Sequence, residues 1–140
     1  MNFLLDTNVI SELRKRSDRM DANVASWATE LNADDAFISA VTISELSQWV
    51  AATSRRDGPQ GALLDRWLNE RVLLTYAGHI LPLDTDVALI TGRLHVPDPR
   101  DYRDAFIAAT AIHHDLTVAT RNVKDFEPIG VPVLNPFDPR

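Results

Sequence analysis

The stretch Asn2-Phe3-Leu4-Leu5-Asp6-Thr7-Asn8-Val9-Ile10-Ser11-Glu12-Leu13 decides the fold of this chain. It opens with a short apolar run that ends in an acid, and it continues in a pattern that looks helical. Such a run predicts a buried strand that leads directly into a helix. A carboxylate at the end of a buried strand costs several kcal/mol unless it is paired or bound to a metal. Asp6 is therefore the first candidate functional residue.

The same unit of strand and helix recurs along the chain. Residues 36–40 are apolar, and the sequence Thr42-Ile43-Ser44-Glu45 opens a helix after them. Residues 80–83 form a third strand, which Pro82 confines to a sheet edge because proline cannot donate to a strand ladder. Asp84 and Thr85 can cap the helix that follows.

The remaining pattern adds helices over 22–31, 63–73 and 102–114, strands over 116–120 and 131–134, and a loop over 54–61. Strands that alternate with helices predict an α/β fold of three layers, with a central, mostly parallel sheet of four to five strands.

Composition limits the classes of protein. The 140 residues carry 14 Lys and Arg against 20 Asp and Glu, a net charge of −6, and no cysteine. This length suits a single domain over 1–140. The absence of cysteine excludes disulfides, Cys-ligated zinc, Fe–S clusters and thiol catalysis. The acidic balance argues against nonspecific coating of nucleic acid, and no apolar stretch approaches the ~20 residues that span a bilayer. We expect a cytoplasmic protein without membrane contact.

Acidic and amide side chains follow most of the predicted strands. In a parallel sheet, ligands bind at the carboxyl ends of the strands, where helix N-termini converge. The residues at these places are Asp6, Glu45, Asp104, Asn122 and Asp125. Carboxylates gathered without matching cations repel one another unless a divalent cation lies among them, and oxygen-only ligands suit Mg²⁺ or Mn²⁺.

Each of these residues also has a structural interpretation. Glu45 lies three residues after Thr42, the spacing of a capping box. Asp104 can complement a helix dipole, and Asn122 and Asp125 fit turn chemistry. The five glycines form no phosphate-binding loop, the four histidines lack ligand spacing, and no serine lies on a glycine-flanked elbow.

Four motifs, in order along the chain, resemble those of the PIN-domain ribonucleases, specifically VapC-type toxins of the FitB-like branch. They are Leu4-Leu5-Asp6-Thr7-Asn8-Val9-Ile10-Ser11-Glu12, Ser39-Ala40-Val41-Thr42-Ile43-Ser44-Glu45-Leu46, Asp104-Ala105-Phe106-Ile107-Ala108-Ala109-Thr110-Ala111, and Val118-Ala119-Thr120-Arg121-Asn122-Val123-Lys124-Asp125-Phe126. The closing Val133-Leu134-Asn135-Pro136-Phe137 fits the same branch. The resemblance spans nearly the whole chain and implies a PIN-domain fold.

The resemblance also implies an activity, that of a metal-dependent endoribonuclease toxin. Asp6, Glu45 and Asp104 would bind Mg²⁺ or Mn²⁺, and an RNA phosphodiester would be cleaved by in-line displacement. The fourth position, often Asp in relatives, is Asn122 here, and Asp125 would either supply the missing carboxylate through water or lie on the side that binds the antitoxin. Thr7 or Thr120 would orient the carboxylates, and local arginines such as Arg100, Arg103 or Arg121 would bind the RNA.

The partners that the resemblance implies are a second copy of the chain in a homodimer and a small VapB- or FitA-like antitoxin. Operator DNA would be bound only through the antitoxin. In related complexes the antitoxin often places a basic side chain among the carboxylates.

Two other classes of function are open at this point. One is a catalytically weak PIN module, attenuated by Asn122, that acts mainly as the corepressor half of a FitAB-like DNA-binding complex. The other is a phosphoryl-transfer protein with Asp6 as nucleophile, although Asp6-Thr7-Asn8 lacks the second Asp of a dehalogenase-type phosphatase and no Lys follows a late strand as a receiver domain requires.

Overall fold

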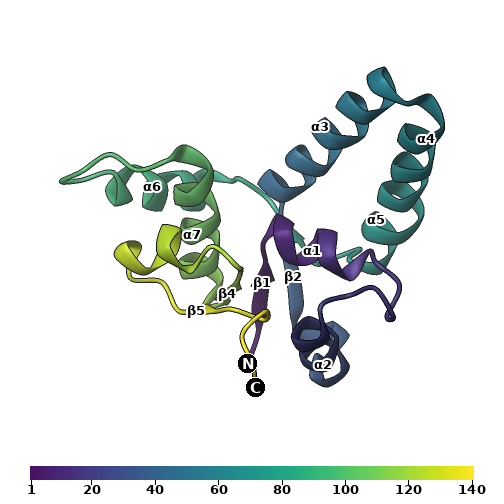
Figure 1. Cartoon of the computed structure of the whole chain (residues 1–140). Coiled ribbons are helices and arrows are strands. Elements are labelled where there is room, and N and C mark those ends of the chain that lie inside the picture. The colour runs from purple at the N-terminus through teal and green to yellow at the C-terminus, as the bar shows by residue number, and fades with distance from the viewer.

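The computed structural model describes all residues from 1 to 140 and has one five-stranded sheet in the order β3-β2-β1-β4-β5 (Figure 1). Every pairing is parallel, and Leu4 in the central strand lies opposite both Phe37 and Val118. The strands are β1 (Phe3–Leu5), β2 (Ala36–Ser39), β3 (Ile80–Leu81), β4 (Thr117–Ala119) and β5 (Val133–Leu134). The predicted parallel sheet is confirmed, and the strand that precedes Pro82 is an edge strand as expected.

Helices cover both faces of this sheet, which Figure 1 shows nearly edge-on at the centre. They are α1 (Thr7–Leu13), α2 (Ala22–Glu30), α3 (Ala40–Arg56), α4 (Gly58–Trp67), α5 (Leu73–Thr75), α6 (Thr85–Leu94), α7 (Tyr102–His114) and α8 (Val123–Phe126). A π-helical turn over Leu68–Val72 joins α4 to α5, and 3-10 turns occupy Ala33–Asp35 and Glu127–Ile129. None of these helices has the length and apolar character needed to cross a bilayer.

The alternation of side chains along β1 builds two cores. Phe3 and Leu5 pack with residues of α1 to α4 on one face, whereas Leu4 packs with α7 and α8 on the other. Leu4 and Leu5 have no exposed surface, and full burial of such a side chain contributes roughly 1.5–3 kcal/mol. This burial fixes the register of β1 and therefore the position of Asp6, the next residue.

The predicted loop over 54–61 is wrong. Helix α3 continues to Arg56 and α4 begins at Gly58, so only Asp57 separates the two helices. The Asp57 side chain accepts a 3.2 Å hydrogen bond from the backbone N–H of Gln60, and Pro59 occupies the first turn of α4, where its missing N–H costs nothing. Asp57 is the cap between the two helices, whereas the Gly and Pro residues lie inside α4. Helices α3 and α4 form the arm at the upper right of Figure 1.

Candidate functional site

Asp6 lies at the carboxyl end of β1 and is the N-cap of α1. Its side chain is fully buried. Oδ1 accepts a 2.7 Å hydrogen bond from the backbone N–H of Thr7, and Oδ2 accepts one of 2.7 Å from the hydroxyl of Thr120, just after β4. Hydrogen bonds to a carboxylate favour its charged form. Two neighbouring strand ends therefore hold Asp6 in one orientation.

Glu45 comes from the second turn of α3, which follows β2 directly. The predicted capping box is wrong, because the helix begins at Ala40 and Ser39 caps it, its hydroxyl accepting a 3.0 Å bond from the N–H of Val41. Glu45 Oε1 instead accepts a 2.6 Å hydrogen bond from the hydroxyl of Thr7. Its carboxylate is thereby turned toward Asp6 rather than toward the helix terminus.

Asp104 lies in the first turn of α7, and the N-cap of that helix is Asp101. Burial raises the pKa of Asp104 above its ordinary value, and the negative charges of Asp125 and Asp101 act in the same direction. A hydrogen bond and positive charge from Arg103 oppose this increase. Asp104 therefore takes part in an electrostatic cluster as well as complementing the dipole of its helix.

The guanidinium of Arg103 joins the three carboxylates. Nε donates a 2.7 Å hydrogen bond to Glu45 Oε2, Nη1 donates one of 2.9 Å to Asp104 Oδ1, and Nη2 donates to Asp6 Oδ1. Burial alone would lower the pKa of Arg103, but the hydrogen bond to Glu45 and the charge of Asp6 outweigh it, and the pKa rises. The guanidinium is thus a permanent cation at the point where three segments of the chain converge.

Polar side chains alone line the open hollow around this cluster: Thr7, Asn8, Glu45, Asp101, Arg103, Asp104, Asn122 and Asp125. Asn122 and Asp125 are exposed, and the side chain of Asn122 does not cap α8. All five residues that the sequence singled out thus lie in or against one site, with Asp6 buried at its base.

The other two candidate arginines lie outside the hollow. Arg100 donates to the backbone carbonyls of Leu94 (3.1 Å) and Pro128 (3.3 Å). Arg121 stacks over the ring of Phe137, 3.8 Å from its centroid. Arg103 is therefore the one cationic side chain that lines the site.

The donor set fits a divalent cation. Three carboxylates already converge on one positively charged group. The other side chains that line the hollow carry hydroxyl, amide or carboxylate oxygens, and oxygen is the ligand atom that Mg²⁺ and Mn²⁺ prefer. As the side chains are placed, no three His, Cys, Asp or Glu residues form a group that could hold a metal ion, and Arg103 bonds to all three carboxylates. Asp6, Glu45 and Asp104 are the residues that could hold such an ion once the guanidinium has moved.

The site disfavours Asp6 as a phosphoryl-accepting nucleophile. Asp6 has no exposed surface, and both of its oxygens already accept hydrogen bonds. No lysine lines the hollow to stabilise a phosphoryl group.

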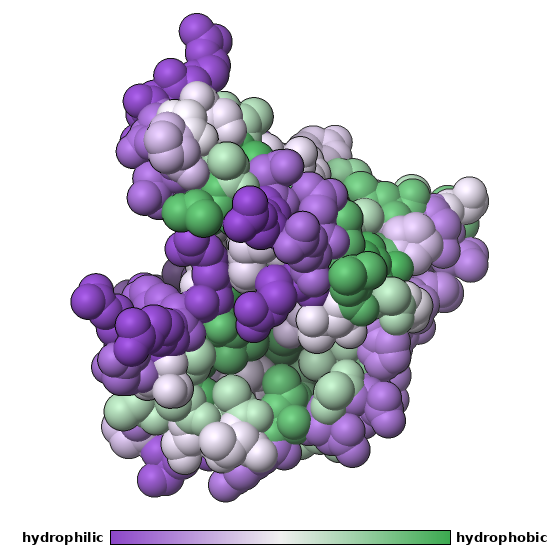
Figure 2. Space-filling view, turned by 90° about the vertical axis from the view of Figure 1, so that its right-hand side faces the viewer, coloured by the Kyte–Doolittle hydropathy of each residue, from purple (hydrophilic) through white to green (hydrophobic).

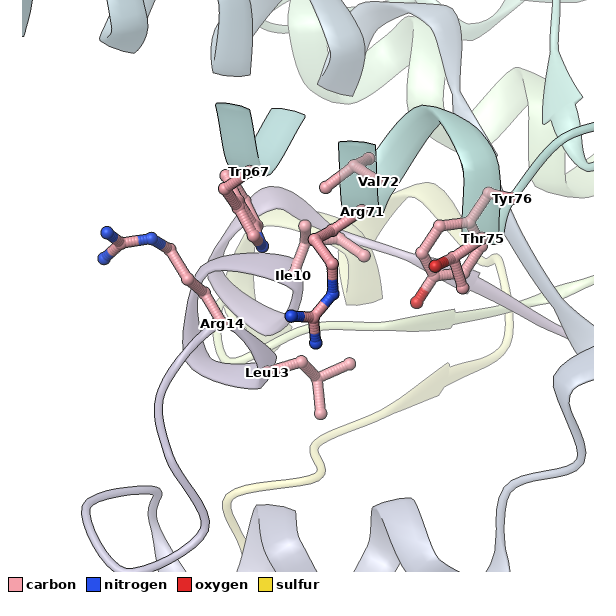
Figure 3. A pocket seen from close by; sticks show the side chains of 8 residues that line it. All are labelled: Ile10, Leu13, Arg14, Trp67, Arg71, Val72, Thr75 and Tyr76. Atoms are coloured by element: carbon pink, nitrogen blue, oxygen red, sulfur yellow. The ribbon is translucent and has the colours of Figure 1, made fainter. Parts of the chain in front are cut away.

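A second hollow lies between α1 and the segment from α4 to α5 (Figure 3). Arg14 and Arg71 lie among apolar side chains such as Ile10 and Leu13, and no acidic residue lines it. Figure 2 shows exposed hydrophobic patches between hydrophilic ones on this side of the molecule. Trp49, which belongs to α3, is 37% exposed. The lining of this hollow thus contrasts with that of the hollow around Arg103, where four carboxylates gather.

Sequence reasoning missed two features of the site. It gave Arg103 a role toward RNA and did not foresee its three bonds to carboxylates, although a basic residue beside a candidate acid was a visible signal. It also missed Asn8, whose amide donates to the Thr120 hydroxyl (3.2 Å) and accepts from the N–H of Arg121 (3.1 Å). No spacing rule would have revealed that bridge between α1 and the end of β4.

Comparison with known proteins identifies relatives over nearly the whole length. The family model described as PIN domain matches residues 3–130. The toxin FitB of Neisseria gonorrhoeae is 38% identical, over 96% of this chain and 98% of its own. The VapC ribonuclease Y4jK of Sinorhizobium fredii is 34% identical, over 98% of this chain and 99% of its own.

The fold is also similar to that of a solved complex. The structure of FitAB bound to an IR36 DNA fragment contains a chain that superposes with a TM-score of 0.88 at 34% identity. The match covers 99% of this chain and 97% of that one. Sequence and structure therefore point to the same group of proteins.

Proposed function

Because this chain belongs to the PIN-domain family, we propose that it is a Mg²⁺-dependent endoribonuclease that acts as the toxin of a VapBC-type toxin–antitoxin system. The observation that carries the proposal is the convergence of Asp6, Glu45 and Asp104, from three separate segments, on a single cationic group. The proposal places this activity in the cytoplasm.

In this account the three carboxylates bind Mg²⁺ or Mn²⁺. A bound divalent cation supplies an acidified water and neutralises negative charge on the phosphate oxygens. The hydroxyls of Thr7 and Thr120 hold Glu45 and Asp6 in orientation through bonds of 2.6 and 2.7 Å. Such supporting hydrogen bonds fix the ligands and raise their affinity for metal.

Asn122 and Asp125 lie at the exposed rim of the hollow. Asn122 contributes an amide and no charge, and Asp125 supplies a carboxylate near Asp104 that acts across a distance or through water. We assign both to the catalytic site, where they complete its polar lining beside the scissile phosphodiester. The open hollow carries four carboxylates against one guanidinium, so a phosphate backbone would bind there only once a divalent cation is present.

The partners follow from the relatives. FitB is named a toxin, and FitAB has been solved on DNA. We propose that this chain forms a homodimer, binds a VapB- or FitA-like antitoxin and contacts operator DNA only through that antitoxin. The acidic site accepts a guanidinium from its own chain, so it suits a basic side chain of the antitoxin equally well. Cleavage that persists at saturating antitoxin would contradict the proposal that the antitoxin binds the acidic site.

The activity can be tested on bacterial RNA. Purified protein without antitoxin is incubated with total RNA in Mg²⁺ or in EDTA, beside Asp6→Asn and the control Asp34→Asn, and new RNA ends are mapped. Asp34 is exposed in the 3-10 turn that precedes β2, at the amino ends of the strands and therefore at the opposite end of the sheet from Asp6. Discrete ends that need Mg²⁺ and disappear only in Asp6→Asn support the proposal. An Asp6→Asn protein that cleaves as fast as wild type contradicts it.

A second candidate function is that of a catalytically weak corepressor half of a FitAB-like complex. The observation that favours it is the uncharged Asn122 in the hollow together with the likeness to FitAB on DNA. Intact binding of antitoxin and operator without any metal-dependent cleavage would support this alternative.

A further inference from the structure

Arg103 binds the three candidate metal ligands simultaneously. Each of its three nitrogens donates to a different carboxylate: one to Glu45 at 2.7 Å, one to Asp104 at 2.9 Å, and the third to Asp6. The accepting oxygens are Glu45 Oε2, Asp104 Oδ1 and Asp6 Oδ1. A guanidinium and a metal ion cannot both take the same lone pairs in close contact, because both are cations and both need those oxygens.

The position of Arg103 allows its guanidinium to leave. The residue is the second of α7, and its side chain is 27% exposed at the open hollow. Its backbone is held by the helix, whereas the side chain has several rotatable bonds that reach toward solvent. Departure therefore needs no movement of the backbone, only a change of rotamers that breaks the three bonds to the carboxylates.

The negative charge of the hollow favours replacement of the guanidinium by a cation of higher charge. Asp6, Glu45 and Asp104 share one positive charge, and Asp101 and Asp125 add two carboxylates at the rim. A divalent ion neutralises such a cluster more fully than Arg103 does.

We propose that Arg103 is the resident cation of the acidic site and competes with the divalent metal for Asp6, Glu45 and Asp104. This inference rests on the proposed function, since it concerns the same site. Arg103 holds the carboxylates together in the metal-free protein, and it must release them before metal binds. The freed guanidinium remains at the mouth of the hollow, where the phosphates of an RNA arrive.

The test measures metal affinity rather than cleavage. Mn²⁺ is titrated calorimetrically into the full-length wild type, Arg103→Met and Arg100→Met. Arg100→Met is the matched control because it removes the same charge from a side chain that binds only carbonyls. We expect Arg103→Met alone to bind Mn²⁺ at least about tenfold more tightly, a change of ~1.4 kcal/mol.

Equal affinity in all three proteins, or weaker binding by Arg103→Met, overturns the inference and leaves the proposed function intact. Absence of Mn²⁺ binding in every protein overturns both.

A second measurement uses wild type alone, so it stands even if Arg103→Met does not fold. In protein labelled with ¹⁵N, the side-chain Nε–H resonance of Arg103 reports its bond to Glu45. Saturating Mg²⁺ should shift that resonance and leave that of Arg100 in place. An Arg103 resonance that is unchanged while the backbone amide of Thr7 responds to Mg²⁺ contradicts the competition.

Discussion

The hydroxyl of Thr120 donates a 2.7 Å hydrogen bond to Asp6 across 114 positions of the chain. It ties the ends of the adjacent strands β4 and β1, and the same oxygen accepts from the N–H of Asn122 at 3.0 Å. Thr120 is fully buried, so the loss of its hydroxyl would leave an oxygen of Asp6 without this partner.

Thr120→Val should therefore weaken both metal binding and folding. Loss of a supporting hydrogen bond typically lowers metal affinity by about tenfold to a hundredfold. Asp6 Oδ2 would keep only the 3.5 Å hydrogen bond from the side-chain amide of Asn8, and this poorly satisfied buried oxygen costs about 1–3 kcal/mol. Calorimetric titration with Mn²⁺ and urea unfolding measure the two effects. Thr120→Ser keeps the hydroxyl and should retain most of the metal affinity; if Ser and Val variants bind alike, the hydroxyl does not orient Asp6.

Gly61 marks the close approach of α4 to α3. A Cβ at this position would lie 2.1 Å from Ser54 Oγ and 2.5 Å from Ser54 Cα. Gly61→Ala should destabilise the protein by about 1–3 kcal/mol, because the helices must separate. Gly92→Ala is the control in α6, where a Cβ meets nothing within 4 Å, and it should stabilise by roughly 0.5–1 kcal/mol. Urea denaturation of both variants measures the two changes in the free energy of unfolding, which should have opposite signs.

Glu12 anchors the connection between α1 and α2. It is 7% exposed and accepts hydrogen bonds from the N–H of Asp21 (2.8 Å) and the ammonium of Lys15 (2.9 Å). Burial acts to raise the pKa of Glu12, but these two bonds outweigh it, so the pKa is below its ordinary value of 4.5. The stabilisation is therefore complete above pH 4.5 and is lost as pH falls through the folded-state value.

Glu12→Gln should consequently be less stable than wild type by about 1–2 kcal/mol near neutral pH, with the difference shrinking below pH 4.5. Urea unfolding across this pH range tests the trend. Lys15→Met serves as a control, because the exposed Lys15 contributes at most about 1 kcal/mol and the bond from Asp21 remains. A difference between Glu12→Gln and wild type that is independent of pH would rule out the ionised carboxylate as its cause.

The sequence was informative where local chemistry sets the structure. The apolar run before Asp6 predicts a buried strand, and β1 lies there in a parallel sheet. The order of the motifs predicted five polar residues at the carboxyl ends of the strands. The helix over Tyr102–His114 and the cap at Asp84 are also as predicted. The PIN-domain resemblance is confirmed by the match over residues 3–130.

The failures occurred where tertiary contacts decide. Pro59 and Gly61 indicated a loop, but the first turn of α4 tolerates the proline, and the glycine permits close packing against Ser54. The capping box of Thr42 and Glu45 does not form because the helix begins earlier, at Ala40, with Ser39 as its N-cap. Glu45 accepts a hydrogen bond from Thr7 instead. Adjacent residues on a helix point about 100° apart, so the joint approach of Arg103 and Asp104 to one centre depends on the length of the arginine side chain.

The most direct test of the acidic site compares Asp104→Asn with Asp101→Asn in single-turnover cleavage of a mapped RNA target in Mg²⁺. Both variants remove one negative charge from the same hollow, but only Asp104 bonds to the central guanidinium, and Asn caps α7 nearly as well as Asp101 does. We predict that Asp104→Asn lowers the cleavage rate by at least about a hundredfold and that Asp101→Asn changes it little. Equal rates in the two variants would contradict a site built on Asp6, Glu45 and Asp104.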